Sequence, residues 1–168
     1  DLMFDESLCE QGRNFCNKIW NANRLIGGWE VSENAHQSES SRIAVRWFGS
    51  VLDRALAEID DHFAAYRISD AMMTAYKLFW DDFSGWYLEM VKPAYGQPID
   101  TETLRATKIY FEKLLQMLHP FMPFVTEELW QNLFPHKEGE SITVSPMPRP
   151  EKVDAKLLAE FELVKDKI

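Results

Sequence analysis

The segment from Gln11 to Ile26, QGRNFCNKIWNANRLI, carries two stripes of side chains at helical spacing, and this pattern constrains the fold more than any other. At 100° per residue, a narrow apolar face is formed by Leu8, Phe15, Ile19, Ala22 and Ile26. The opposite face is formed by Asn14, Asn17, Asn21 and Arg24, with Arg13 and Lys18 beside it. The segment is therefore predicted to be a helix with a core-facing side and an amide-rich side.

The amide-rich side is unusual for a helix surface. Asn costs about 0.5–0.7 kcal/mol relative to Ala in a helix interior, and a solvated face normally carries Glu, Lys, Gln or Arg. Between Gln11 and Trp29 there are three basic residues and no acid, although the whole chain has a net charge of −9. Two interpretations follow: a buried amide cluster bonded to neighbouring loops, or a surface whose Asn and Arg side chains bind bases and phosphates. Spacing alone favours the first and leaves the second open.

The rest of the chain shows more apolar stripes of helical period, separated by Gly and Pro. They predict long helices over residues 40–66, 69–92 and 100–118, and a shorter one over 127–133. Ser69 and Asp100 are the expected N-caps of two of these helices. The polar stretch 29–38 is predicted to be a loop, and Glu33 and His36 in it are too few for a metal site.

The C-terminal part changes character after Pro135. Residues 141–145 alternate and are β-branched, which favours a short strand. A last helix over 155–168 is expected to pack Leu157, Leu158, Phe161 and Val164. The predicted fold class is all-α: an antiparallel bundle of four long helices plus a shorter fifth, then a strand-like tether and a terminal helix. We expect residues 1–135 to form the bundle and residues 136–168 a linker, a short strand and the start of a C-terminal helical extension.

Composition limits the possible functions. The chain contains no apolar run of about 18 residues, so it is not expected to enter a membrane. The acidic opening without a leading Met resembles no secretory signal and fits a fragment cut from a longer chain. Cys9 and Cys16 are seven residues apart on one helix, about 10 Å at 1.5 Å rise per residue, so we expect reduced thiols and a cytoplasmic protein. The acidic balance argues against general DNA or RNA binding and requires any RNA contact to be local.

Three segments, in order, resemble a known family. These are GRNFCNKIWNANRLI, FSGWYLEMVKP (83–93) and LLQMLHPFMPFVTEELWQNLF (114–134). Together they are similar to the anticodon-binding domain of class I aminoacyl-tRNA synthetases for valine, isoleucine, leucine and methionine, with the valine members most similar. The resemblance covers about residues 5 to 135. It implies a monomer whose partner is a tRNA anticodon stem-loop, within a parent enzyme that joins valine to its tRNA using ATP.

The resemblance also gives expected roles to individual residues. Asn14, Asn17, Asn21 and Arg24 would read unpaired bases. Arg13, Lys18 and Lys92 would contact phosphates. Trp86, near the end of the third long helix, would stack on an unstacked base, unless it is simply a buried Trp whose indole N–H finds a partner.

No catalytic chemistry is found in the chain. The His-x-Gly-His pattern and the Lys-rich loop of class I synthetases are missing, and so is any Gly-rich phosphate loop. His119, before Pro120, is expected to cap or pack. We therefore expect no catalytic residue, metal or cofactor in this fragment, ATP belonging to the parent's catalytic domain. The alternatives are the same domain from an isoleucine or leucine enzyme, and a helical scaffold that binds only protein.

Overall fold

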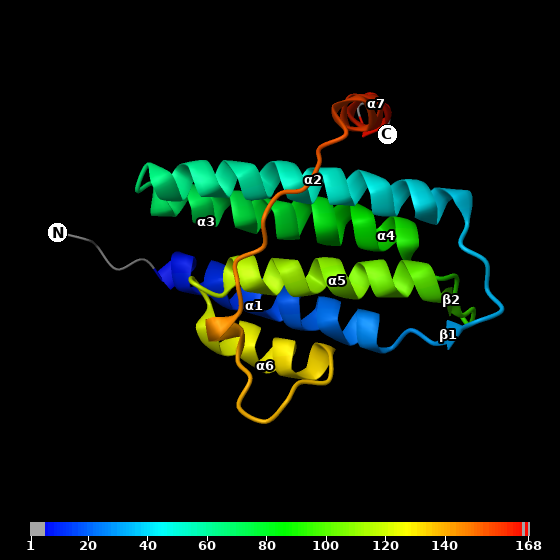
Figure 1. Ribbon diagram of the computed structural model, residues 1–168, viewed down its shortest axis with the longest axis horizontal. Helices are drawn as coiled ribbons and strands as arrows, with labels where there is room; N and C mark the ends of the chain where they lie inside the picture. Colours follow the sequence, from blue (N-terminus) through cyan, green and yellow to red (C-terminus); the bar gives the residue numbers. More distant parts are fainter. Residues whose placement is uncertain (1–5, 166, 168) are drawn as a thin grey trace.

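The computed structural model describes residues 6–165 and Lys167, except the side chain of Leu8. Its order is α1 (Glu6–Gly27), β1 (Val31–Ser32), α2 (Glu39–Ala64), α3 (Ile68–Lys77), η1 (Leu78–Tyr87), α4 (Leu88–Val91), β2 (Ile99–Asp100), α5 (Thr101–Leu118), α6 (Pro123–Leu133), η2 (Ile142–Val144) and α7 (Ala155–Lys165). The fold is the expected all-α bundle (Figure 1). Within the described part of the chain, no helix is long and apolar enough to cross a membrane.

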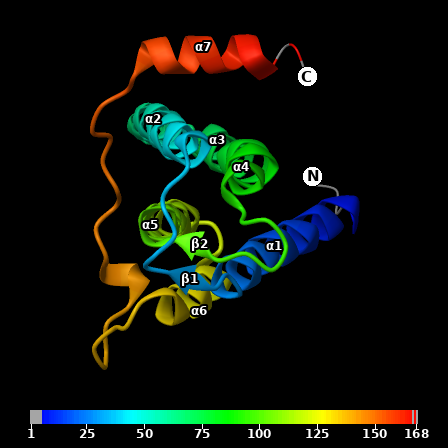
Figure 2. The same ribbon diagram turned by 90° about the vertical axis from the view of Figure 1, so that its right-hand side faces the viewer.

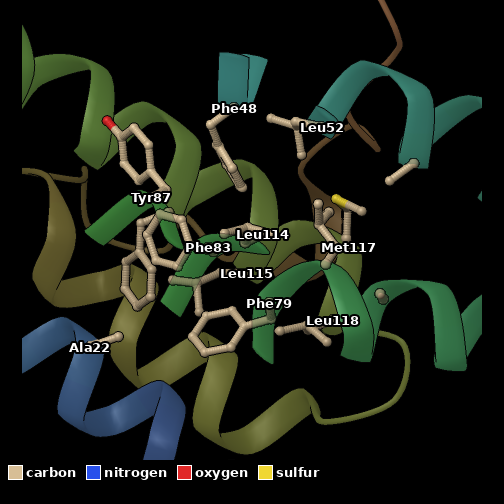
Figure 3. Packing of buried hydrophobic residues seen from close by; sticks show 14 of the residues in the cluster. Ala22, Phe48, Leu52, Phe79, Phe83, Tyr87, Leu114, Leu115, Met117 and Leu118 are labelled. Atoms are coloured by element: carbon tan, nitrogen blue, oxygen red, sulfur yellow. The ribbon is translucent and has the colours of Figure 1, made fainter. Parts of the chain in front are cut away.

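Four long helical segments form the bundle. Seen end-on, α1 and α2 occupy opposite corners, with the α3–η1–α4 segment and α5 between them (Figure 2). The apolar stripe of α1 is buried as predicted, with Phe15, Ile19, Ala22 and Ile26 in the core. Leu8, predicted for the same stripe, lies outside the described side chains. Phe79, Phe83 and Tyr87 of η1 fill the centre against Phe48 of α2 (Figure 3).

The third long helix is continuous from Ile68 to Val91 but widens to π-type geometry over η1. Hydrophobic periodicity predicted one helix and did not reveal the π segment. The prediction of Ser69 as the N-cap is wrong. The helix begins at Ile68, and Arg67 occupies the cap position without a side-chain hydrogen bond. Asp100 does cap α5, since its carboxylate accepts from Thr103 N at 2.8 Å.

A two-residue parallel strand pair ties two loops together at one end of the bundle. Val31 pairs with Ile99 and Ser32 with Asp100, and Ile99 N donates to Glu30 O at 2.8 Å. The loop predicted over residues 29–38 is confirmed except at Val31 and Ser32, which form this short strand. Two residues are too few for alternation to be visible in the sequence, so the pairing emerges only from the tertiary structure.

The predicted strand over 141–145 is also wrong, because Ile142–Val144 forms a 3-10 turn. Ser141 Oγ accepts from Thr143 N at 3.2 Å, and Ile142 is buried. The β-branched residues pair with no strand in the part of the chain that the structure describes. The short helix α6 begins at Pro123, four residues before the predicted start, with Pro at the first helical position.

Helix α7 crosses the outer side of α2 (Figures 1 and 2). Phe161 stacks on Trp47 with ring centroids 4.2 Å apart, and Leu158 is buried beside it. Leu157 is half-buried, but Val164 is half exposed, so its predicted inward position is wrong. The predicted helix end at Ile168 lies outside the described residues.

Candidate nucleic-acid interface

The amide-rich face of α1 is open to solvent. Asn14, Asn17, Asn21 and Arg24 are all exposed. Their side chains form no hydrogen bond or salt bridge with any residue that the structure describes. The interpretation as a buried amide cluster is therefore wrong. What remains is a row of free amide donors and acceptors along one helix, ending in an Arg.

The charge along this face is positive in an otherwise acidic chain. Glu10 is the nearest acid to the N-terminal end of this face, and it forms a 3.5 Å salt bridge with Arg13 between two exposed side chains. Such exposed pairs contribute only about 0–1 kcal/mol, so Arg13 can exchange this partner for a phosphate. Arg24 stands in the last turn of α1, where a cation also complements the helix dipole.

Lys18 lies on the flank of the face that meets η1. Its ammonium is 3.9 Å from the centroid of the Trp80 ring, and Trp80 in turn stacks on Tyr76 at 5.6 Å. This cation–π contact fixes the position of the charge at the edge of the amide face. The structure thus brings Arg13, Lys18, Asn14, Asn17, Asn21 and Arg24 together on one surface.

Lys92 lies at the C-terminal end of the same face. It follows α4, is exposed and forms a salt bridge with Glu89. Together with Leu25 and Gly28 of the α1 end, it lines a pocket of about 300 Å³. This predicted site residue is therefore near the others, although it is far from them in sequence.

Trp86 lies elsewhere. Its half-buried ring packs edge-on against Phe161 of α7 at 6.1 Å, and Lys165 Nζ is 5.5 Å from its centroid. Helix α7 is separated from α1 by the bundle (Figure 2). The geometry therefore does not bring Trp86 to the amide face.

Two exposed aromatic residues were missed by the sequence reasoning. Trp20 is 43% exposed. At 100° per residue it lies 40° from Arg24 and 60° from Asn17, but 100° from Asn21, so the periodicity that revealed the amides places Trp20 beside their face, next to Arg24. Tyr95, in the loop after α4, is fully exposed and lines the pocket with Lys92. No periodic pattern covers that loop, so the sequence held no comparable signal for Tyr95.

The described residues contain no group of three or more His, Cys, Asp or Glu side chains that could hold a metal ion. His119 has a structural role, as expected, since its ring nitrogens contact Thr126 Oγ1 at 2.8 Å and Thr143 Oγ1 at 3.1 Å. Cys9 and Cys16 are both free, and Cys9 is exposed, so only Cys16 can contribute to packing.

Comparison with known proteins gives a consistent picture. Residues 45–168 match the family described as the anticodon-binding domain of tRNA ligase. The chain is 60% identical over 166 residues to a valine–tRNA ligase of Parabacteroides distasonis, covering 99% of this chain and 19% of the relative. It is 56% identical over 168 residues to that of Phocaeicola vulgatus (100% and 19%) and 39% identical over 175 residues to that of Geobacillus kaustophilus (99% and 20%). The chain thus spans about a fifth of the length of the curated relatives it matches.

Proposed function

The chain belongs to the family of anticodon-binding domains of tRNA ligases, and from this premise we propose that it recognises the anticodon stem-loop of a tRNA. The observation that carries the proposal is the exposed amide face of α1. Asn14, Asn17, Asn21 and Arg24 have no partner within the described part of the protein, in a helix where Asn lowers stability. An RNA loop offers unpaired bases whose edges supply the missing partners.

The chemistry of the face suits this role. Each Asn amide offers a donor and an acceptor, and Arg24 offers a planar fork that can pair with two acceptors of one base. Arg13, Lys18 and Lys92 are proposed to contact phosphates around these readers, as point charges or forks. The net charge of −9 repels polyanions from the rest of the surface, so binding is confined to α1 and its flanks.

We assign the stacking role to Trp20 in place of Trp86. Trp20 is partly exposed and lies beside the amide face next to Arg24, whereas Trp86 is packed against α7. Stacking of an unpaired base on an aromatic ring contributes about 1–3 kcal/mol and tolerates any base. Trp20 would therefore hold the strand while its amide neighbours discriminate between bases.

The parent protein is proposed to be a valine–tRNA ligase, which joins valine to its tRNA using ATP. The names of the three relatives above support valine over isoleucine or leucine. Catalysis and the ATP site are assigned to the parts of the parent that this chain does not include. The chain itself would contribute recognition only.

The experiment that tests this function is Arg24→Ala in the complete protein that contains the chain. Affinity for a valine tRNA should fall by about 1–3 kcal/mol, and by less for the same tRNA with an altered anticodon, because the lost contact is to a base. Arg67→Ala is the matched control, since Arg67 is exposed, forms a salt bridge with Asp70 and lies between α2 and α3, at the opposite end of the bundle from the C-terminal end of α1. An equal loss for both tRNAs would make Arg24 a phosphate contact. No detectable binding of the unmodified protein to either would leave the protein-binding scaffold as the better function.

A further inference from the structure

The charge of Lys18 is held by an aromatic ring and not by an acid. Its ammonium is 3.9 Å from the centroid of the Trp80 ring, and its side chain forms no hydrogen bond or salt bridge with any residue that the structure describes. The other two proposed phosphate contacts, Arg13 and Lys92, each form a salt bridge with a glutamate. Among the three cations, Lys18 therefore has an ordered charge that no carboxylate compensates.

The Trp80 ring is fixed by a small aromatic cluster. Tyr76 stacks on it with ring centroids 5.6 Å apart and an interplanar angle of 17°, and the ring of Phe15 is 6.2 Å away. Phe15 also contacts Tyr76 at 4.7 Å and is buried in the apolar stripe of α1. Turning the Trp80 ring away from Lys18 would break these contacts, so the support for the ammonium is rigid.

An aromatic ring orders a cation without occupying its hydrogen-bond donors. The face of an indole attracts an ammonium through the quadrupole of the ring, and the N–H donors that point away from the ring stay free for phosphate oxygens. A carboxylate, by contrast, must be displaced before a phosphate can take its place. A Lys side chain also loses rotamer freedom when it binds a partner, and a contact that already restricts the side chain reduces this loss.

Lys18 flanks the amide face on the side of η1. At 100° per residue it lies about 40° from Asn14 and about 60° from Asn21. We propose that Lys18 is the principal phosphate anchor of this surface and that Trp80 is a positioning residue, which acts on the RNA only through Lys18. The inference rests on the proposed function and adds to it a rank among the three cations and a role for η1.

The first test measures binding of the anticodon stem-loop of a valine tRNA to the complete protein at several salt concentrations. Lys18→Gln should weaken binding about 10-fold and reduce the slope of log K against log salt by about 0.7, the value for one phosphate contact to a single strand. Arg13→Gln and Lys92→Gln should each cost less, and an equal or larger loss in either would overturn the rank of Lys18. Lys77→Gln is the matched control, because Lys77 is exposed in the groove between α2 and α3.

The second test weakens the cation–π contact and leaves the packing in place. Trp80 is replaced by tryptophan that carries one, two and then three ring fluorines, which withdraw charge from the face of the ring and add little volume. Affinity should fall stepwise, by about 2- to 10-fold over the series, with an unchanged salt slope because Lys18 keeps its charge. In the Lys18→Gln protein the same series should have no effect, which a merely structural role of Trp80 would not produce.

A fluorine series that leaves the affinity unchanged, or that acts equally in the Lys18→Gln protein, would overturn the role of Trp80. Tighter binding with more fluorine would overturn it as well, because it would show that the ring withholds Lys18 from the RNA. If Arg24→Ala weakens binding and the Lys18 and Trp80 variants do not, only this inference is wrong. If none of them has an effect, the proposed function falls with it.

Discussion

Asn17 and Asn21 are exposed helix residues of a type that lowers helix stability. Both are exposed and without a partner among the described residues, so replacing both by Ala should stabilise the fold by about 0.5 kcal/mol per site. For a chain of this length, about 1 kcal/mol corresponds to a rise of about 2–4 °C in the thermal midpoint. The same variant should bind the tRNA more weakly. A lowered midpoint would show that the amides hold the bundle together and would remove the functional argument for this face.

At the residue scale, the sequence was informative wherever helical periodicity applies. It placed the side chains of Asn14, Asn17, Asn21 and Arg24 on one face of the helix. It did not show whether that face was covered, because burial depends on which helices pack beside it. The same rotation of 100° per residue would have placed Trp20 beside this face. Tyr95 and the turn at Gly96 lie in a loop, where no period exists and the backbone is determined by tertiary contacts.

At the scale of elements, the attachment of α7 is testable. Phe161 stacks on Trp47, and Lys165 Nζ is 3.2 Å from Asp82 and 5.1 Å from the Trp47 centroid. Phe161→Ala should destabilise the protein, by up to about 3–5 kcal/mol if α7 stays docked and by less if it detaches and exposes Trp47. Tryptophan fluorescence during a denaturant titration distinguishes the two cases. Leu163→Ala is the control, because Leu163 is exposed and its loss should change stability by less than about 0.5 kcal/mol.

Elements were predictable where their signals are local. Helix α5 begins after Asp100 as its cap chemistry predicted. Conversely, the strand pair depends on a partner far along the chain, and hydrophobic periodicity marks neither the π segment η1 nor the 3-10 turn at Ile142. Helix α7 was predicted, but its packing against Trp47 was not. The division of the chain into two domains at residue 135 remains a prediction. The Phe161→Ala variant tests it, because the loss of contacts from an independent extension would leave the stability of the bundle unchanged.

At the scale of the molecule, the exposed polar face and the tightly packed interior lie on different sides of α1, so binding and stability can be changed separately. The interior contains two tyrosines whose hydroxyls are bonded. Tyr87 Oη donates to Thr107 Oγ1, which itself donates to Thr103 O, and Tyr110 Oη donates to Val45 O, each at 2.8 Å. These bonds join the third helix and α2 to α5.

The two tyrosines make stability depend on alkaline pH. Burial raises the pKa of Tyr110 from 10.0 to about 12, and burial also raises the pKa of Tyr87. Both phenols keep their protons longer in the folded state than in the unfolded chain, so their contribution is fully present below about pH 10 and is lost as pH rises through about 12. For Tyr110 alone, about 2 pKa units correspond to about 2–3 kcal/mol.

We therefore expect the free energy of unfolding, measured by urea titration, to fall between pH 10 and pH 12. Tyr110→Phe should be less stable than the unmodified protein at pH 8, because the bond from Tyr110 Oη to Val45 O is lost, and should show a shallower fall above pH 10. Tyr66→Phe is the control, since Tyr66 is exposed and its change should leave the slope as it is. Parallel pH curves for Tyr110→Phe and the unmodified protein would show that this hydroxyl is not coupled to folding.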